Sequence, residues 1–148
     1  MMMMIMVVVA GWEVLRGDSD MEFIDDFGGC CMVVVVSKKG VLTIKGMGDA
    51  SGMSRYEFET EIPVSDADHL LSLCDQPLIE KTRYKYDFED LTWEVDEFHG
   101  VNEGLVVAEV ELESEDQQFN KPDFVGEEVT GQVKYYNMML LKNPYTTW

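Results

Sequence analysis

The chain has 148 residues, 46% of them hydrophobic, so it is long enough for one domain, residues 1–148, with a core, and it is not disordered. Its 29 Asp and Glu residues against 11 Lys and Arg give a net charge of −18, which excludes nucleic-acid binding through the general surface. Three cysteines argue against a disulfide framework and indicate a reducing compartment, so we expect the cytoplasm. The apolar first ten residues are about half the length needed to span a membrane, and we expect a buried strand there.

Strands dominate the predicted elements. They are expected, in chain order, at residues 4–10, 21–24, 30–36, 41–45, 55–62, 79–86, 91–98 and 105–112. Helices are expected at residues 65–74 and 133–142, with a short helix opening at Ser114 and a loop around Pro122 and Gly126. Residues 4–10 and 30–36 are apolar on both faces, whereas the later strands are charged on one face. A closed antiparallel barrel accounts for both patterns.

The segment 91–112 has the densest pattern of charge. Because side chains alternate along a strand, Glu94 and Asp96 share one face of its first strand, and Glu109 and Glu111 share one face of its second. The link HGVNEG contains two glycines and an asparagine, which favours a hairpin between them. Carboxylates placed this close repel one another, so we expect either a metal ion or basic side chains between them.

Basic residues recur at strand spacing among the acidic ones. Lys45, Arg55, Lys81 and Arg83 alternate with acidic residues on their own or neighbouring strands. For a single strand, a solvated network of surface ion pairs would explain this, but the pattern persists over five strands. Convergent Lys and Arg side chains suit a polyphosphate, and clustered carboxylates suit Mg²⁺ or Mn²⁺. Together they are the ingredients of metal-assisted phosphoryl transfer.

Several sequence blocks, in their order and spacing, resemble the CYTH superfamily of triphosphate tunnel enzymes over about residues 40–148. The blocks are VLTIKG, SRYEFETEI, EKTRY, WEVDEF, GLVVAEVELESED, FVGEEVTG and the YYN near the end. The likeness points to the small bacterial inorganic triphosphatases or adenylate-cyclase-like proteins. It implies an α+β fold dominated by strands, an eight-stranded antiparallel tunnel barrel with a few flanking helices. It also implies cleavage of a triphosphate with a divalent metal.

The resemblance also implies roles for individual residues. Substrate-binding positions match Lys45, Arg55, Lys81, Arg83 and Lys134, where the family usually has Arg at the last. Positions that hold metal and orient water match Glu57, Glu59, Glu94, Asp96, Glu109 and Glu111. The resemblance assigns no further catalytic residue. Some of these carboxylates should have raised pKa values, because they outnumber their basic partners and are partly desolvated.

The first strands depart from the family pattern. The first-strand motif Glu-x-Glu-x-Lys and the alternating arginines of a later strand fall instead on Met4, Met6 and Val8 and on Met32, Val34 and Val36. Each set alternates in step along its own strand, so we expect the six residues to line one apolar wall of the barrel interior. A concerted change to Met and Val is typical of a tunnel rebuilt to be apolar, as in an engineered pocket.

Three functions follow from these patterns. The favoured one is a tunnel-fold protein whose triphosphatase activity is lost, because missing phosphate contacts remove charge compensation in the transition state. Its cavity would hold an apolar small molecule, or collapse on its own side chains. The alternatives are an active metal-dependent triphosphatase or cyclase-like enzyme, with Mg²⁺ or Mn²⁺ as cofactor, and a structural or interaction domain. The expected partner is a small molecule rather than nucleic acid or membrane, and a homodimer is left open.

Overall fold

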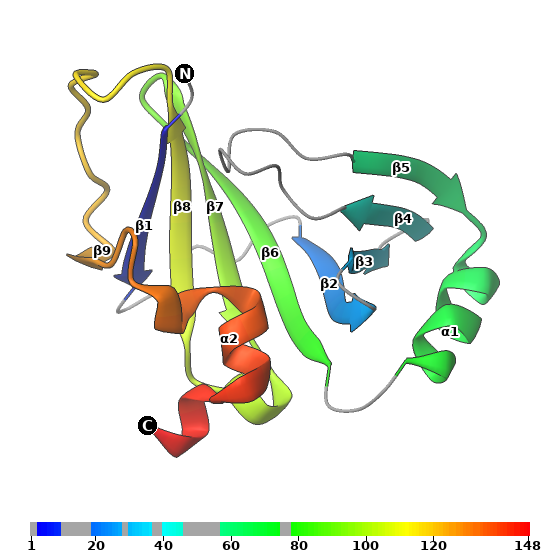
Figure 1. Ribbon diagram of the computed structural model, residues 1–148. Coiled ribbons are helices and arrows are strands. Elements are labelled where there is room, and N and C mark those ends of the chain that lie inside the picture. Colours follow the sequence, from blue (N-terminus) through cyan, green and yellow to red (C-terminus); the bar gives the residue numbers. More distant parts are fainter. Residues whose placement is uncertain (1–2, 10–18, 28–29, 37–39, 46–56, 75–77) are drawn as a thin grey trace.

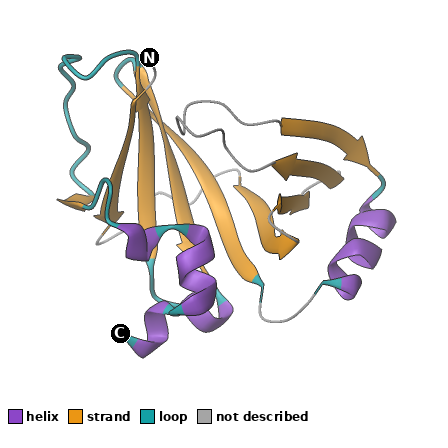
Figure 2. Ribbon diagram, in the orientation of Figure 1, coloured by secondary structure: helices purple, strands orange, loops and turns teal. Residues whose placement is uncertain are grey.

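The computed structural model describes residues 3–9, 19–27, 30–36, 40–45, 57–74 and 78–148. Its strands are β1 (Met3–Val9), β2 (Ser19–Phe27), β3 (Cys30–Val36), β4 (Gly40–Lys45), β5 (Glu57–Ile62), β6 (Ile79–Phe88), β7 (Leu91–Phe98), β8 (Val106–Leu112) and β9 (Val125–Glu128). They form one nine-stranded sheet in the order β5-β4-β3-β2-β6-β7-β8-β1-β9. Every neighbouring pair is antiparallel. The prediction of a strand-dominated antiparallel fold with few helices is therefore confirmed (Figure 2).

The sheet is open, so the predicted closure into an eight-stranded barrel is wrong for the part of the chain that the structure describes. The strand order ends at β5 on one side and at β9 on the other. The segment that forms β9 was expected to be a loop, but it pairs with the edge of β1, and the Val129 amide donates to the Met6 carbonyl at 2.8 Å. The outer edge of β1 is therefore covered by β9. Figure 1 shows β1, β8, β7 and β6 standing side by side, with β2 to β5 on the far side of β6.

The strand register places one set of positions on a single face of the sheet. Directly opposed residues of antiparallel strands lie on the same face. Arg83 is opposite Asp96, and Glu94 is opposite Glu109. Glu109 is in turn opposite Met6 of β1. We call this the charged face. On β1 and on β4 to β8, the positions used below are Lys45, Glu57, Glu59, Lys81, Arg83, Lys85, Glu94, Asp96, Glu109, Glu111, Met4, Met6 and Val8.

Strand β3 overturns one expectation about the apolar wall. Its register with β2 and β4 carries the charged face through Cys31, Val33 and Val35. A difference of one residue in register moves a whole strand to the other face of a sheet. Met32, Val34 and Val36 therefore belong to the opposite face, and the six apolar positions do not form one wall. Only the β1 set, Met4, Met6 and Val8, shares the charged face.

Two groups of buried side chains hold the sheet. On the face opposite to the charged one, Trp93 and Val95 of β7 pack with Ile5 and Val7 of β1. Residues of the segment after β8, including Phe119 and Phe124, cover this group. The second group lies on the charged face itself, where Leu140 packs against side chains near one end of the sheet. Its other members are Ile79, Phe98, Leu105 and Val107, with Met6 partly buried beside them.

The helices differ from expectation at their ends. Helix α1 (Val64–Leu73) begins one residue early, after Pro63, and Ser65 makes no capping hydrogen bond. The helix expected at Ser114 is a turn. The helix expected over 133–142 is divided at Tyr136, whose backbone is extended (ψ 141°), into a 3₁₀ turn η3 (Val133–Tyr135) and α2 (Asn137–Lys142).

Two further 3₁₀ turns complete the described elements, η2 (Gly100–Asn102) in the β7–β8 link and η4 (Tyr145–Thr147) near the end of the chain. The side chain of Asn102 is fully buried and accepts a hydrogen bond from the Tyr145 amide at 2.8 Å. This contact joins the link to the C-terminal segment. Within the described ranges, no helix combines the length and apolar character required to cross a bilayer.

Candidate functional site

Arg83 lies on the charged face within ion-pair distance of three carboxylates of the described strands. Its Nε donates to Asp96 Oδ1 at 2.7 Å and its Nη2 to Asp96 Oδ2 at 2.8 Å, which is a bidentate pair. Its Nη1 donates to Glu94 Oε2 at 2.8 Å, and Nη2 lies 3.8 Å from Glu109 Oε2. The expectation that basic side chains would lie between the carboxylates of the hairpin is confirmed.

Lys81 forms a buried ion pair beside this network. Its Nζ lies 2.8 Å from Asp96 Oδ2, both side chains are 3% exposed, and the ammonium is 5.6 Å from the centre of the Phe98 ring. Burial alone would raise the pKa of Asp96. The positive charges of Lys81 and Arg83 and the hydrogen bonds that they donate outweigh burial, so the pKa of Asp96 is lowered. The Asp96 carboxylate is thus bound by both Lys81 and Arg83.

Glu109 is shifted in the other direction. Burial raises its pKa, and the negative charges of Asp96 and Glu94 add to that effect, with partial compensation from Lys81 and Arg83. Its place in the sheet explains the shift, because Glu109 is opposite a carboxylate on one side and opposite Met6 on the other. The prediction that some carboxylates have raised pKa values is confirmed for Glu109.

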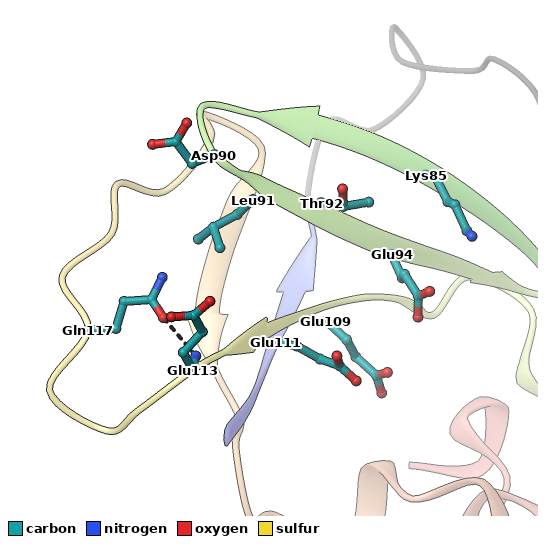
Figure 3. A pocket seen from close by; sticks show the side chains of 9 residues that line it. All are labelled: Lys85, Asp90, Leu91, Thr92, Glu94, Glu109, Glu111, Glu113 and Gln117. Carbon is teal, nitrogen blue, oxygen red and sulfur yellow. Dashed lines mark hydrogen bonds between the residues drawn. The ribbon is translucent and has the colours of Figure 1, made fainter. Parts of the chain in front are cut away.

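An open pocket of about 590 Å³ extends along the charged face from Glu94 toward the β6–β7 turn. Its described lining residues are Lys85, Asp90, Leu91, Thr92, Glu94, Glu109, Glu111, Glu113 and Gln117. In Figure 3, Lys85, Glu94, Glu109 and Glu111 project from their three strands into the same space. Beyond them, the Glu113 amide donates to Gln117 Oε1 at 2.7 Å and fixes the turn at the pocket rim.

Two of the predicted metal-binding carboxylates lie elsewhere. Glu57 and Glu59 are on the charged face but on β5, at the far edge of the open sheet, and both are exposed. Thr43 Oγ1 donates to Glu59 Oε2 at 3.3 Å. Strands β4, β3 and β2 lie in the sheet between β5 and β6, the first strand that lines the pocket. The structure therefore does not bring these two carboxylates together with Glu94, Glu109 and Glu111.

Of the other three predicted substrate-binding residues, the structure describes the side chain of Lys134 and places it away from the pocket. The backbone of Lys45 pairs with Glu57, and Arg55 lies outside the described residues. Lys134 is exposed on η3, with its Nζ 5.0 Å from the centre of the Tyr135 ring and 4.4 Å from that of Trp148. These are cation–π distances. Lys134 is held by aromatic side chains and does not line the pocket.

Sequence reasoning missed several residues that line the pocket. Lys85 continues the alternation of Lys81 and Arg83 on β6, so its position could have been predicted from spacing. Glu113 and Gln117 come from the turn after β8, where no motif indicates a site. Their presence depends on how that turn folds over the pocket rim.

The pocket carboxylates fit a hard divalent cation by their chemistry. Mg²⁺ prefers oxygen ligands, retains several waters and is often held by only one or two carboxylates together with substrate phosphates. Glu94, Glu109 and Glu111 offer such oxygens on adjacent strands, and the pKa of Glu109 is raised first by burial and then by the negative charges of Asp96 and Glu94. In the described ranges, no three His, Cys, Asp or Glu side chains converge tightly enough to hold a metal ion by themselves. A cation here would need oxygens from water or substrate as well.

Comparison with known proteins finds relatives over more than half of the chain. The CYTH domain matches residues 35–137. The inorganic triphosphatase of Acetivibrio thermocellus is 56% identical over 114 residues, covering 76% of this chain and 72% of that protein. The inorganic triphosphatase of Nitrosomonas europaea is 38% identical over 102 residues, covering 67% and 66%.

Solved structures agree in fold. The crystal structure of the inorganic triphosphatase NE1496 has a TM-score of 0.68 at 26% identity and covers 94% of this chain and 96% of that chain. A putative adenylyl cyclase from Hippeastrum, at 14% identity and a TM-score of 0.51 over 77% of this chain and 80% of that one, shares the fold alone. The family match starts at residue 35, after β1, β2 and most of β3. Of these strands, β1 and β3 are the ones that depart from the motif pattern. The chain belongs to the CYTH domain family.

Proposed function

We propose that the pocket binds an inorganic triphosphate together with Mg²⁺ or Mn²⁺, and that the chain hydrolyses it far more slowly than its relatives do. The observation that carries this proposal is the register of β1. Met4 is opposite Glu111 and Met6 is opposite Glu109, so the strand beside the pocket contributes no charged group on that face at these positions. The family resemblance gives Glu-x-Glu-x-Lys there.

Dependence on a divalent cation follows from the charge of the pocket. Five of its described lining residues are Asp or Glu, and one is Lys. The charges of Lys81 and Arg83 are largely compensated by their carboxylate partners. A triphosphate brought against these carboxylates is repelled unless a cation lies between them. When bound, such an ion neutralises charge on the transferred phosphoryl group.

The protein groups have separable roles in this proposal. Glu94 and Glu111 supply oxygens to the cation. Arg83 is held by Asp96 and Glu94, which orients its guanidinium on the charged face to contact phosphate oxygens. Glu109 Oε2 would accept a proton from the attacking water, since a raised pKa makes a carboxylate a stronger base. What β1 fails to supply is further compensation of charge in the transition state.

Two assays test the proposal. The first measures binding of tripolyphosphate with Mg²⁺ by calorimetry. The second compares phosphate release with that of the Acetivibrio thermocellus relative under the same conditions. We expect binding that requires Mg²⁺, and a turnover rate at least about 100-fold below that of the relative, since losing one stabilising group can cost this much. A rate within a few-fold of the relative would contradict the proposed slow turnover, and no binding would leave only a structural or interaction role.

A fully active inorganic triphosphatase is the second candidate, favoured by the 56% identity with the Acetivibrio thermocellus protein. The apolar-ligand hypothesis has less support. The described pocket is lined mainly by carboxylates, and Met6 packs against the buried group beneath α2 instead of lining that pocket. The side chain of Met6 is thus accommodated by protein contacts. Loss of activity and an engineered origin of the first strands stay predictions.

A further inference from the structure

Lys85 differs from the two other basic residues of β6. It lies two residues after Arg83 on the same face, opposite Glu94, and its side chain is exposed. Among the described residues that line the pocket, it is the single Lys or Arg. Figure 3 shows its ammonium directed into the space shared with Glu94, Glu109 and Glu111. A positive charge is therefore present at the part of the pocket where carboxylates otherwise prevail.

The three basic residues also differ in their existing contacts. Lys81 and Arg83 are bound to Asp96 at 2.7–2.8 Å. Within the described part of the chain, no carboxylate lies at ion-pair distance from Lys85. An ammonium without such a partner can bind a ligand anion without first breaking an internal ion pair. Among the three basic residues of β6 on this face, Lys85 is the one for which that cost is smallest.

Position along the strand assigns Lys85 to one end of a bound ligand. Residues two apart on a strand are separated by about 7 Å, so Lys85 lies one step closer than Arg83 to the pocket rim at Asp90 and Gln117. A shorter phosphate anion held at Arg83 extends less far toward this step. A chain of three phosphates held at Arg83 would extend toward it.

We infer that Lys85 is a specificity-determining residue, which binds the phosphate of a triphosphate that lies farthest from Arg83. The inference rests on the proposed function and deepens it, because it distinguishes a triphosphate from a shorter anion. The Lys85 ammonium donates to phosphate oxygens as a compact point charge and offsets repulsion from Glu94 and Glu111. Lys85 binds ligand in this account and takes no part in the phosphoryl transfer itself.

The test compares Lys85→Gln with Lys142→Gln. Lys142 is exposed in the last turn of α2 and does not line the pocket, so both variants lose one positive charge from an exposed position. Calorimetry measures the Kd of tripolyphosphate and of pyrophosphate, each with Mg²⁺. For Lys85→Gln we expect the Kd of tripolyphosphate to rise about five- to tenfold and that of pyrophosphate less than about twofold. Lys142→Gln should change neither by more than about twofold.

Each other outcome has a distinct meaning. If the unmodified chain binds tripolyphosphate but the two variants have the same Kd, the role of Lys85 is overturned and the proposed function stands. Equal weakening of both anions by Lys85→Gln would show a general charge effect and overturn the specificity. If the unmodified chain binds no tripolyphosphate with Mg²⁺, both the inference and the proposed function fail.

Discussion

Strands β7 and β1 flank β8 on its two sides and contribute opposite chemistry to the same face. On one side Glu94 stands opposite Glu109, and on the other side Met6 does. On the other face the two strands are alike, since Trp93 and Val95 of β7 and Ile5 and Val7 of β1 are all buried. Burial on that face fixes β1 in the sheet, and on the charged face Met6 adds only partly buried contacts. The charged face of β1 is therefore where function can change without loss of the fold.

The largest expected effect comes from breaking the β7 side of the comparison. Asp96→Ala removes the carboxylate that lies 2.8 Å from the buried Lys81 ammonium, which should lower the free energy of unfolding by about 3–5 kcal/mol. Denaturation in urea measures this loss. Glu111→Ala on β8 is the control, because Glu111 is exposed and its removal should cost less than about 1 kcal/mol. Similar losses of free energy of unfolding in the two variants would show that the buried ion pair stabilises the fold no more than an exposed carboxylate does.

A second pair of variants separates the two faces of β1. Ile5 is 4% exposed in the core opposite the charged face, so Ile5→Ala should cost about 2–4 kcal/mol. Met6 is partly buried at the edge of the group under α2, and Met6→Ala should cost about half as much or less. Thermal unfolding of the two variants provides the comparison. A larger loss for Met6→Ala would mean that the charged face of β1 is the one that holds the strand in place.

The pH dependence of stability tests the position of Glu109 between the two strands. Its raised pKa means that the folded chain binds this proton more tightly than the unfolded chain. The resulting stability is complete below the ordinary Glu value of 4.5 and is lost as pH rises through the folded pKa. Glu109→Gln removes the charge. The free energy of unfolding of this variant should therefore increase relative to that of the unmodified chain as pH rises above 4.5. Parallel stability curves for the two proteins would contradict the raised pKa.

The smallest effect concerns the residue opposite Glu109 on β1. Met6→Glu places a like charge directly across from Glu109, which should raise the pKa of Glu109 further. Met6→Gln, of the same shape but neutral, should raise it less. Carboxyl NMR titration of the two variants reports the difference. Identical titration of Glu109 in both would mean that β1 does not have the register with β8 described above.

The site was predictable where local alternation decides the outcome. The faces of β7 and β8 follow from period 2, and so does the pairing of Glu94 with Glu109 once a hairpin joins the strands. Closure of the sheet and the face of β3 were not predictable in this way, because both depend on which strands pair and in which register. A four-residue strand such as β9 has no pattern long enough to distinguish it from a loop. The capping signal at Ser114 is equally compatible with the turn that forms there.

The central proposal is that the apolar positions of β1 keep the charged face from efficient catalysis. The most direct measurement is phosphate release from tripolyphosphate with Mg²⁺ by the triple variant Met4→Glu, Met6→Glu, Val8→Lys. Its control replaces all three residues by Gln. The account predicts a gain of at least about tenfold over the unmodified chain in the charged variant alone, because the added groups compensate charge in the transition state. No gain in the charged variant, or an equal gain in the Gln control, would contradict it.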